Sequence, residues 1–152
     1  MCVADLARNR ISYIDLSFFA HATEDQNKVL EAARNIMPPE YADQIVFSES
    51  NLKGEYGNPI VFFKTQIRDT EVAEAFLRGA AASLAPLDKE TLLQELDLHL
   101  ERGSLYMRAD KQTAFRGRFK LGRADPIHIR IRFKTSKAEE IREICRNIGV
   151  LP

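Results

Sequence analysis

Tryptophan is absent from this 152-residue chain, which also has only two cysteines, seven glycines and six prolines. Cys2 and Cys145 stand near opposite ends, without CxxC or Cys/His spacing, so neither a disulfide framework nor a structural zinc site is expected. No apolar run approaches the roughly 20 residues that span a bilayer. The first ten residues, MCVADLARNR, lack the pattern of a signal peptide. We therefore expect a cytoplasmic protein with reduced thiols.

Motifs of common enzyme classes are also missing. The three histidines, His21, His99 and His128, form no H-x-H or H-E-x-x-H pattern, and no cysteine lies near them. The sequence contains no G-x-S-x-G elbow, no G-x-G-x-x-G loop and no P-loop. We therefore expect a protein that is not an enzyme and that carries no metal, nucleotide or other cofactor.

The composition is that of an ordinary globular protein, with 45% hydrophobic and 29% charged residues. A chain of this length is close to one domain by the usual range of roughly 100–200 residues. No linker, repeat or low-complexity stretch interrupts it. The sequence predicts a single domain over residues 1–152.

The formal net charge of zero hides an uneven distribution. Residues 104–134 carry nine cations and two acids, a net charge of +7, and the remainder of the chain carries −7. Such a separation is an argument about partners and not about fold. It is compatible with nucleic-acid binding, and equally with an acidic half and a basic half that neutralise each other.

Hydrophobic periodicity divides the first half into strands and helices. Residues 11–20 alternate with period two and predict a strand. Thr23 is predicted to cap a helix over about 24–37, which Pro38 and Pro39 end. The runs 45–52 and 59–68 predict two strands joined by a glycine-containing loop. Asp69 is predicted to cap the next helix, which Pro86 ends, and a short helix follows over 88–95.

The second half returns to strands. Leu96, Leu98 and Leu100 alternate with polar residues and predict a strand that turns through 102–104 into another over 105–108. Residues 115–121 suggest a weak strand or a loop, and 127–133 a strong strand with isoleucines and Phe133 on its buried face. Ser136 is predicted to cap the last helix, which Gly149 ends.

The order β-α-β-β-α-(α)-β-β-(β)-β-α mixes hairpins with isolated helices. It predicts an α+β protein in which helices pack on one face of a mostly antiparallel sheet.

Two loops carry more polar and glycine residues than a simple connection needs. In the 54–60 segment, GEYGNPI, two glycines allow positive φ, and the loop is either a rigid platform for Lys53, Tyr56 and Asn58 or a tight connection whose glycines only satisfy geometry. In the 108–112 segment, Asp110 is predicted to cap a helical turn from which Lys111 and Gln112 project outward. Its cations suit either phosphate or neighbouring acids.

Four blocks together resemble a known family. HATED, GEYGNPI, RADKQTAFRG and ADPIHIRI stand at 21–25, 54–60, 108–117 and 124–131. In this order they resemble the archaeal RNA-binding proteins described as predicted exosome subunits, over roughly residues 11–148. The resemblance implies an RNA-binding role in an archaeal cytoplasm, and a fold like that of the large-subunit ribosomal protein that binds the small ribosomal RNA. It implies no catalytic residues. We expect GEYGNPI and RADKQ to lie near each other.

The leading hypothesis is a non-enzymatic RNA-binding protein that recognises backbone and shape through a basic surface of its C-terminal half, as an accessory factor of an RNA-processing complex such as the exosome. Tyr56, Tyr106 and Phe115 are candidate stacking partners. The expected RNA-binding residues are Lys53, Tyr56, Asn58, Arg108, Lys111, Gln112, Arg116, Arg118, Lys120, Arg130, Arg132 and Lys134.

Other hypotheses stay open at this point. One is a protein-interaction or assembly module with an acidic partner, and another is a small-molecule enzyme that uses Asp110 and Lys111. A homodimer through an edge strand is also open. The last strand poses the question most sharply, because Arg130, Arg132 and Lys134 point the same way and require nearby anions. Those anions are either RNA phosphates or the acids of the preceding hairpin, Asp97 and Glu101.

Overall fold

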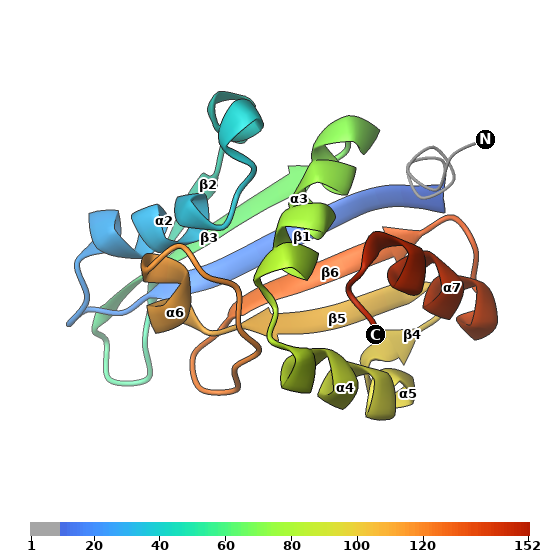
Figure 1. Ribbon diagram of the computed structural model, residues 1–152. Coiled ribbons are helices and arrows are strands. Elements are labelled where there is room, and N and C mark those ends of the chain that lie inside the picture. Colours follow the sequence, from blue (N-terminus) through green and yellow to red (C-terminus); the bar gives the residue numbers. More distant parts are fainter. Residues whose placement is uncertain (1–9) are drawn as a thin grey trace.

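The computed structural model describes residues 10–152; Cys2 lies outside the described residues. A six-stranded antiparallel sheet in the order β2-β3-β1-β6-β5-β4 forms one layer, and helices form the other (Figure 1). The α+β architecture predicted from the sequence is therefore confirmed. The elements are β1 (Ile11–Ala20), α2 (Gln26–Asn35), a 3-10 helix (Pro39–Gln44), β2 (Ser48–Lys53), β3 (Pro59–Ile67), α3 (Thr70–Ser83), α4 (Pro86–Gln94), α5 (Leu96–His99), β4 (Leu100–Glu101), β5 (Ser104–Ala109), α6 (Lys111–Phe115), β6 (Ile127–Phe133) and α7 (Ala138–Ile148).

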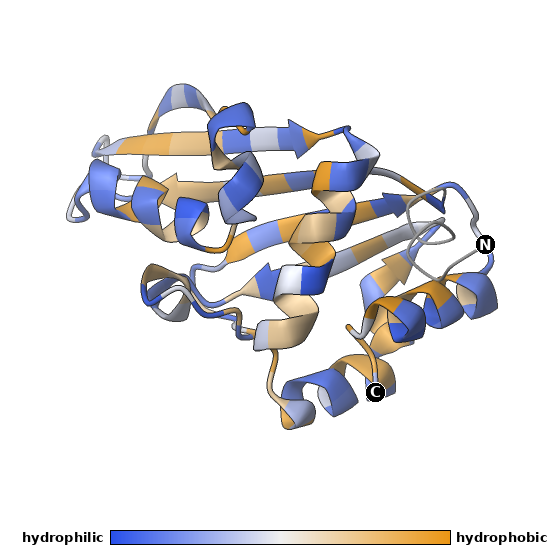
Figure 2. Cartoon of the chain, turned by 45° about the horizontal axis from the view of Figure 1, so that its top comes forward, coloured by the Kyte–Doolittle hydropathy of each residue, from blue (hydrophilic) through white to orange (hydrophobic). Residues whose placement is uncertain are grey.

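The hydrophobic core lies between the sheet and its helices. Alternate residues of β1 and β6 face the helices and are almost fully buried: Ile14, Leu16, Phe18, Ile127, Ile129, Ile131 and Phe133. Burying such side chains contributes roughly 1.5–3 kcal/mol each, so these rows fix the register of the central strands. In Figure 2 hydrophobic and hydrophilic residues alternate along the strands and helices. The predicted burial of the β6 isoleucines is confirmed.

Aspartate side chains cap the starts of α2 and α3. Asp69 caps α3 as predicted, accepting from the N–H of Glu71 at 2.9 Å. The prediction for Thr23 is wrong, because residues 22–23 lie in a turn and the Asp25 carboxylate accepts from the N–H groups of Asn27 and Lys28. Aspartate is the better N-cap.

The last helix also starts one residue later than predicted. Lys137, not Ser136, is the N-cap of α7, and its backbone N–H donates to Thr135 Oγ1 at 3.2 Å. Gly149 ends this helix in the left-handed conformation, as predicted.

The largest difference between the predicted and observed elements is at residues 96–99, where a strand was predicted. The alternating leucines form the short helix α5, and only Leu100 and Glu101 pair with β5. Leu96 is buried, whereas Leu98 is exposed, so the period-two pattern does not correspond to a buried face. The helical turn predicted after Asp110 is the short helix α6, which Asp110 caps, and Leu121 makes a single bridge to Ala109.

The two long connections that the sequence singled out end at the same edge of the molecule. The tip of the β2–β3 hairpin and the β5–α6 connection lie at one end of the sheet (Figure 1). In strand order β1 and β6 stand between them. GEYGNPI and RADKQ therefore lie at the same end of the sheet, but two strands separate them.

Candidate nucleic-acid interface

The helices cover one face of the sheet, and the other face is open (Figure 1). Because side chains alternate along a strand, every second residue of the central strands points away from the core. We call this surface the open sheet face. It consists of Tyr13, Asp15, Ser17, Phe19, Phe62, Lys64, Gln66, Tyr106, Arg108, His128, Arg130 and Arg132.

A cross-strand row of cationic and polar residues runs through the middle of the open sheet face. Arg108 pairs with His128, His128 with Ser17, and Ser17 with Lys64. Neighbouring strands lie about 4.8 Å apart, so Arg108 and Lys64 stand about 14 Å apart along this row. Burial, together with the nearby Arg108 guanidinium, lowers the pKa of His128 below its usual 6.5. The positive charge of the row therefore comes from Arg108 and Lys64, at its two ends.

Arg130 links two tyrosines in the next row. Its guanidinium carbon lies 5.9 Å from the ring centroid of Tyr13 and 5.8 Å from that of Tyr106. Its Nε donates to Ser104 Oγ at 3.1 Å. These contacts fix a half-buried cation between two rings on three adjacent strands. The arrangement provides both positive charge and flat aromatic surface.

A second aromatic group stands at the loop end of the open sheet face. The ring centroids of Phe19 and Phe62 lie 5.0 Å apart, and Phe19 also stacks near His21, at 6.3 Å. Phe19 and Phe62 are paired across β1 and β3 and are only partly buried. The cationic row therefore lies between two groups of aromatic side chains.

Helix α5 turns part of the open sheet face into a groove of about 560 Å³. Leu98, His99 and Glu101 line one side of the groove, and the cationic row lines its floor. The groove exists because residues 96–99 coil into a helix instead of extending the sheet. Its charged lining includes Lys64, Arg108 and Arg130 against Asp15 and Glu101.

The basic last strand has a different set of partners from the acids considered above. Arg132 donates to the backbone carbonyl of Arg102, and Arg130 contacts Ser104 and the two tyrosines. The expected strand spacing for Asp97 is wrong, because Asp97 lies on α5. Lys134 is exposed just beyond β6, and its backbone N–H donates to the Arg10 carbonyl at 2.7 Å.

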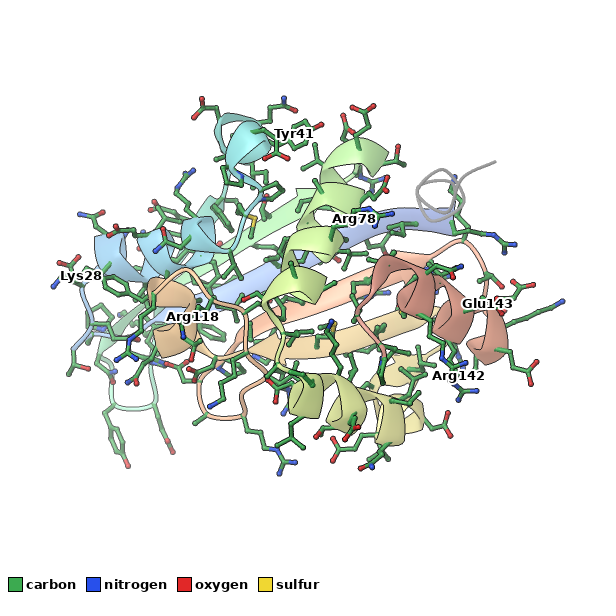
Figure 3. The ribbon with its side chains drawn as sticks, in the orientation of Figure 1. Lys28, Tyr41, Arg78, Arg118, Arg142 and Glu143 are labelled. Carbon is green, nitrogen blue, oxygen red and sulfur yellow. The ribbon has the colours of Figure 1, made fainter. Side chains whose placement is uncertain are left out.

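The segment 115–119, which carries Arg116 and Arg118, lies against the helices on the other side of the molecule. Asn35 on α2 donates to the Phe115 carbonyl at 2.9 Å, and Phe119 N–H donates to Ser83 Oγ on α3 at 2.7 Å. These bonds tie the segment to the helices, and Arg118 appears on that side in Figure 3. Arg116, Arg118 and Lys120 are all exposed. The predicted residues of the C-terminal half are therefore distributed between two surfaces.

Lys111 does not project outward as predicted. Its side chain is only 10% exposed, and Nζ donates to the Phe19 carbonyl at 2.8 Å and to Asp125 Oδ2 at 2.7 Å. Glu24 accepts from the same Nζ at 3.3 Å, and His21 Nε2 lies 3.0 Å from Asp125 Oδ1. A nearly buried ammonium without carboxylate partners would be costly, which explains the inward direction. Gln112 and Phe115 remain exposed.

His21, Glu24 and Asp125 bring their ligand atoms within 4.8 Å of one another, close enough to suit a cation. The Lys111 ammonium supplies the positive charge between these carboxylates. Burial raises the pKa of Asp125, but hydrogen bonds from Lys111 and His21 outweigh it and hold that pKa below 3.8. The cluster thus joins three of the four sequence blocks in one ion-pair network.

The hairpin tip favours the tight-connection interpretation of GEYGNPI. Gly54 N–H donates to the Asn58 carbonyl at 2.7 Å, and Gly57, at φ +80°, donates to the Gly54 carbonyl at 2.9 Å. A Cβ atom at Gly54 would lie 2.9 Å from the side-chain amide of Asn58 and 3.0 Å from Cδ1 of Ile60. Lys53 and Tyr56 are exposed.

Several residues of the open sheet face were not among the expected site residues: Tyr13, Ser17, Phe19, Phe62, Lys64 and His128. The period-two pattern of residues 11–20, 59–68 and 127–133 contains the signal that identifies them. Their polar and aromatic alternation on a strand marks a face that no helix covers.

Comparison with known proteins links this fold to RNA. A family model described as RNA binding matches residues 13–133. The chain belongs to this RNA-binding family. It is 35% identical over 124 residues, 80% of each chain, to RNA-binding protein PAB1135 of Pyrococcus abyssi. It is 30% identical to the uncharacterized protein MJ0213 of Methanocaldococcus jannaschii, over 90% of this chain and 97% of that one.

Solved structures share this fold. The crystal structure of AF2318 from Archaeglobus fulgidus, a DUF54 protein, has a TM-score of 0.76 and 30% identity, and covers 91% of this chain and 99% of that one. Mth689, a DUF54 protein from Methanothermobacter thermautotrophicus, has a TM-score of 0.73 and 26% identity over 90% and 98% of the two chains. Within residues 10–152 there is no helix long and apolar enough to cross a membrane.

Proposed function

We propose that this chain binds RNA on the open sheet face and that it contributes binding, not catalysis. The observation that carries the proposal is the row from Arg108 through His128 to Lys64, which lines the groove beside α5 and lies between aromatic groups. Arginine and lysine supply the phosphate contacts that dominate RNA affinity. Membership of the RNA-binding family supports the same ligand.

The local acids leave this row able to accept phosphate. Asp15, the carboxylate among the central strands of the open sheet face, accepts from the Gln66 side chain at 2.8 Å. Lys64 and Arg108 are exposed, so a ligand can reach both. An acidic protein partner is the competing hypothesis, and it makes a different prediction for competition by RNA.

The test compares two charge-matched double variants. Arg108→Ala with Lys64→Ala removes two cations from the open sheet face, and Lys28→Ala with Arg146→Ala removes two exposed cations from the helical side. Binding of a labelled oligoribonucleotide is measured by fluorescence anisotropy over a salt series. We expect the first variant to bind about tenfold or more weakly and to lose roughly one to two units of salt slope.

The control variant should bind RNA like the wild type. Equal losses in both variants would mean that net charge, not this surface, governs binding. If the wild type binds an acidic polypeptide and RNA does not compete, the protein-partner hypothesis replaces ours.

The finer role we propose is that of an accessory factor of an exosome-like RNA-processing complex, which rests on the family resemblance. Tagged protein purified from an archaeal cell should bring down RNA-processing subunits before ribonuclease treatment. A homodimer remains a prediction; the exposed edge strand β2 is a candidate contact. Light scattering of the Asn51→Pro variant tests it, because the backbone N–H of Asn51 points away from β3 and proline there blocks strand addition at that edge.

A further inference from the structure

Strand β5 has a gap in its outer edge. On that side Leu100 of β4 pairs with Leu105 of β5. The next bridge along this edge joins Ala109 to Leu121. Gly122 N–H donates to the Arg108 carbonyl at 2.9 Å, and Asp110 N–H to the Lys120 carbonyl at 2.8 Å. Because hydrogen-bonding direction alternates along a strand, the N–H and C=O of Tyr106 point into the gap.

Two hollows meet at this gap. The groove of about 560 Å³ lies on the open sheet face, and a second hollow of about 500 Å³ lies outside β5, between α4 and the 121–123 segment. Both hollows are lined by Leu98, His99, Tyr106 and Arg108. A chain lying in the groove can therefore continue over the edge of the sheet into the second hollow.

The second hollow offers groups that suit a nucleotide. Arg123 stands on its rim with an 87% exposed side chain, at 3.9 Å from Glu95. Such an exposed pair is weak, so a phosphate can readily displace the carboxylate. Tyr106 and His99 add flat rings, and the Tyr106 backbone adds a donor and an acceptor for a base edge.

We propose that the RNA bound here is single-stranded and that it crosses the edge of β5 at Tyr106, leaving one nucleotide in the second hollow. This inference rests on the proposed RNA-binding function. Arg108 and Arg123 contact phosphates on the two sides of the crossing, and the Tyr106 ring stacks on a base. A single strand can do this because its bases are free to leave their neighbours.

Duplex RNA fits the same surface poorly. Its bases are stacked inside the helix, and its deep major groove excludes side chains. The aromatic rings of the open sheet face would then contact only the sugar-phosphate backbone of the duplex. The gap at Tyr106, between Leu105 and Ala109, is too short for a rigid double helix to enter. The aromatic side chains and the gap would contribute nothing to duplex binding.

The first experiment compares one oligoribonucleotide alone and annealed to its complement, by anisotropy under identical salt. We expect the single strand to bind at least tenfold more tightly, as the stacking of one or two bases would give. Equal or tighter duplex binding overturns this inference but leaves the proposed function standing. Absence of binding to either form overturns both.

The second experiment tests the crossing itself. Tyr106→Phe keeps the ring and should retain single-strand affinity within about twofold, whereas Tyr106→Leu should lose roughly fivefold to a hundredfold. Arg123→Ala should reduce the salt slope by about 0.7, the value for one phosphate of a single strand. Arg118→Ala, an exposed arginine on the helical side, is the matched control and should change neither quantity.

The Arg123→Ala variant should fold normally, because the Arg123 side chain is exposed. It therefore tests the crossing even if a variant of Tyr106 does not fold. If Tyr106→Leu unfolds, the Arg123 and Arg118 pair decides. Equal binding by Tyr106→Leu and the wild type, or equal salt slopes in Arg123→Ala and the wild type, overturns the proposed crossing.

Discussion

Lys111 Nζ donates to Asp125 Oδ2 at 2.7 Å, which ties the start of α6 to the turn that precedes β6. The same ammonium donates to the Phe19 carbonyl at the end of β1. One side chain thus holds together three segments that converge at the loop end of the sheet. It also fixes the edge of the surface on which Phe19 and His128 stand.

Replacing Lys111 should therefore weaken the fold. Lys111→Met removes the ammonium and leaves the carboxylates of Glu24 and Asp125 without their shared donor. Since these acids are partly exposed, we expect a loss of about 2–3 kcal/mol in the free energy of unfolding, less than for a fully buried pair. Urea denaturation measures it. Lys28→Met, on the exposed face of α2, is the control and should change stability by under about 0.5 kcal/mol.

The same network should make stability sensitive to acid. The folded pKa of Asp125 is lowered: burial raises it, but the hydrogen bonds from Lys111 and His21 dominate. A lowered folded pKa stabilises the protein above the unfolded value of about 3.9, and that stability is lost as the pH falls through the folded pKa. We expect the wild type to lose stability below about pH 4. The Asp125→Asn variant should lose less over the same range, and an identical loss in both proteins would contradict the assignment.

The hairpin glycine Gly57 offers a test of backbone geometry alone. At φ +80° it lies in the left-handed region, and an added Cβ would meet nothing within 4 Å. Gly57→Val should therefore lower the free energy of unfolding by about 1–2 kcal/mol through strain, while Gly57→Asn should lower it less.

Gly79, in α3, also has open space around it but a helical backbone. Gly79→Ala should instead stabilise the protein, by about 0.4–1 kcal/mol in thermal or urea unfolding.

Binding measurements on Gly57→Val separate the two interpretations of GEYGNPI. If the loop is only a tight connection, the variant loses stability and keeps its RNA affinity under folding conditions. Weaker binding by a folded variant would instead assign the tip, with Lys53 and Tyr56, to the RNA interface.

The sequence predicted the layers of this fold well because burial dominates the central strands. The alternation of Ile127 through Phe133 and of residues 11–20 leaves one arrangement that hides the apolar rows. The prediction from sequence was wrong at residues 96–99, where the leucine spacing is compatible with both a strand and a helical turn. Only the packing of Leu96 against the core distinguishes the two.

The candidate site was predicted in part for a related reason. Sequence shows which residues are cationic, but not which side of the molecule a loop follows. Arg118 and Arg130 stand 12 positions apart in a basic stretch, yet Asn35 and Ser83 hold the first segment on the helical side. Lys111 was misjudged because its partners, Glu24 and Asp125, are distant in sequence or outside any periodic pattern.

The Arg130→Ala, Arg132→Ala double variant should lose both RNA affinity and stability. Arg130 packs between Tyr13 and Tyr106, and Arg132 donates to the Arg102 carbonyl, so both have structural roles besides any phosphate contact. We expect a loss of roughly 1–2 kcal/mol in unfolding free energy, from the cation–π contacts and a hydrogen bond, and a salt slope lower by one to two units. Unchanged affinity and slope would remove these two arginines from the interface.

The histidine of the cationic row should give RNA binding a pH dependence. Burial and the neighbouring Arg108 lower the pKa of His128, so in the free protein it is mostly neutral near pH 7. Phosphates beside it favour the charged form and raise its pKa in the complex, so binding takes up a proton. Affinity should therefore rise as the pH falls from about 7.5 to 5.5. His128→Gln should flatten this rise. A pH profile that is the same in His128→Gln and the wild type would exclude His128 from contact with the bound phosphates.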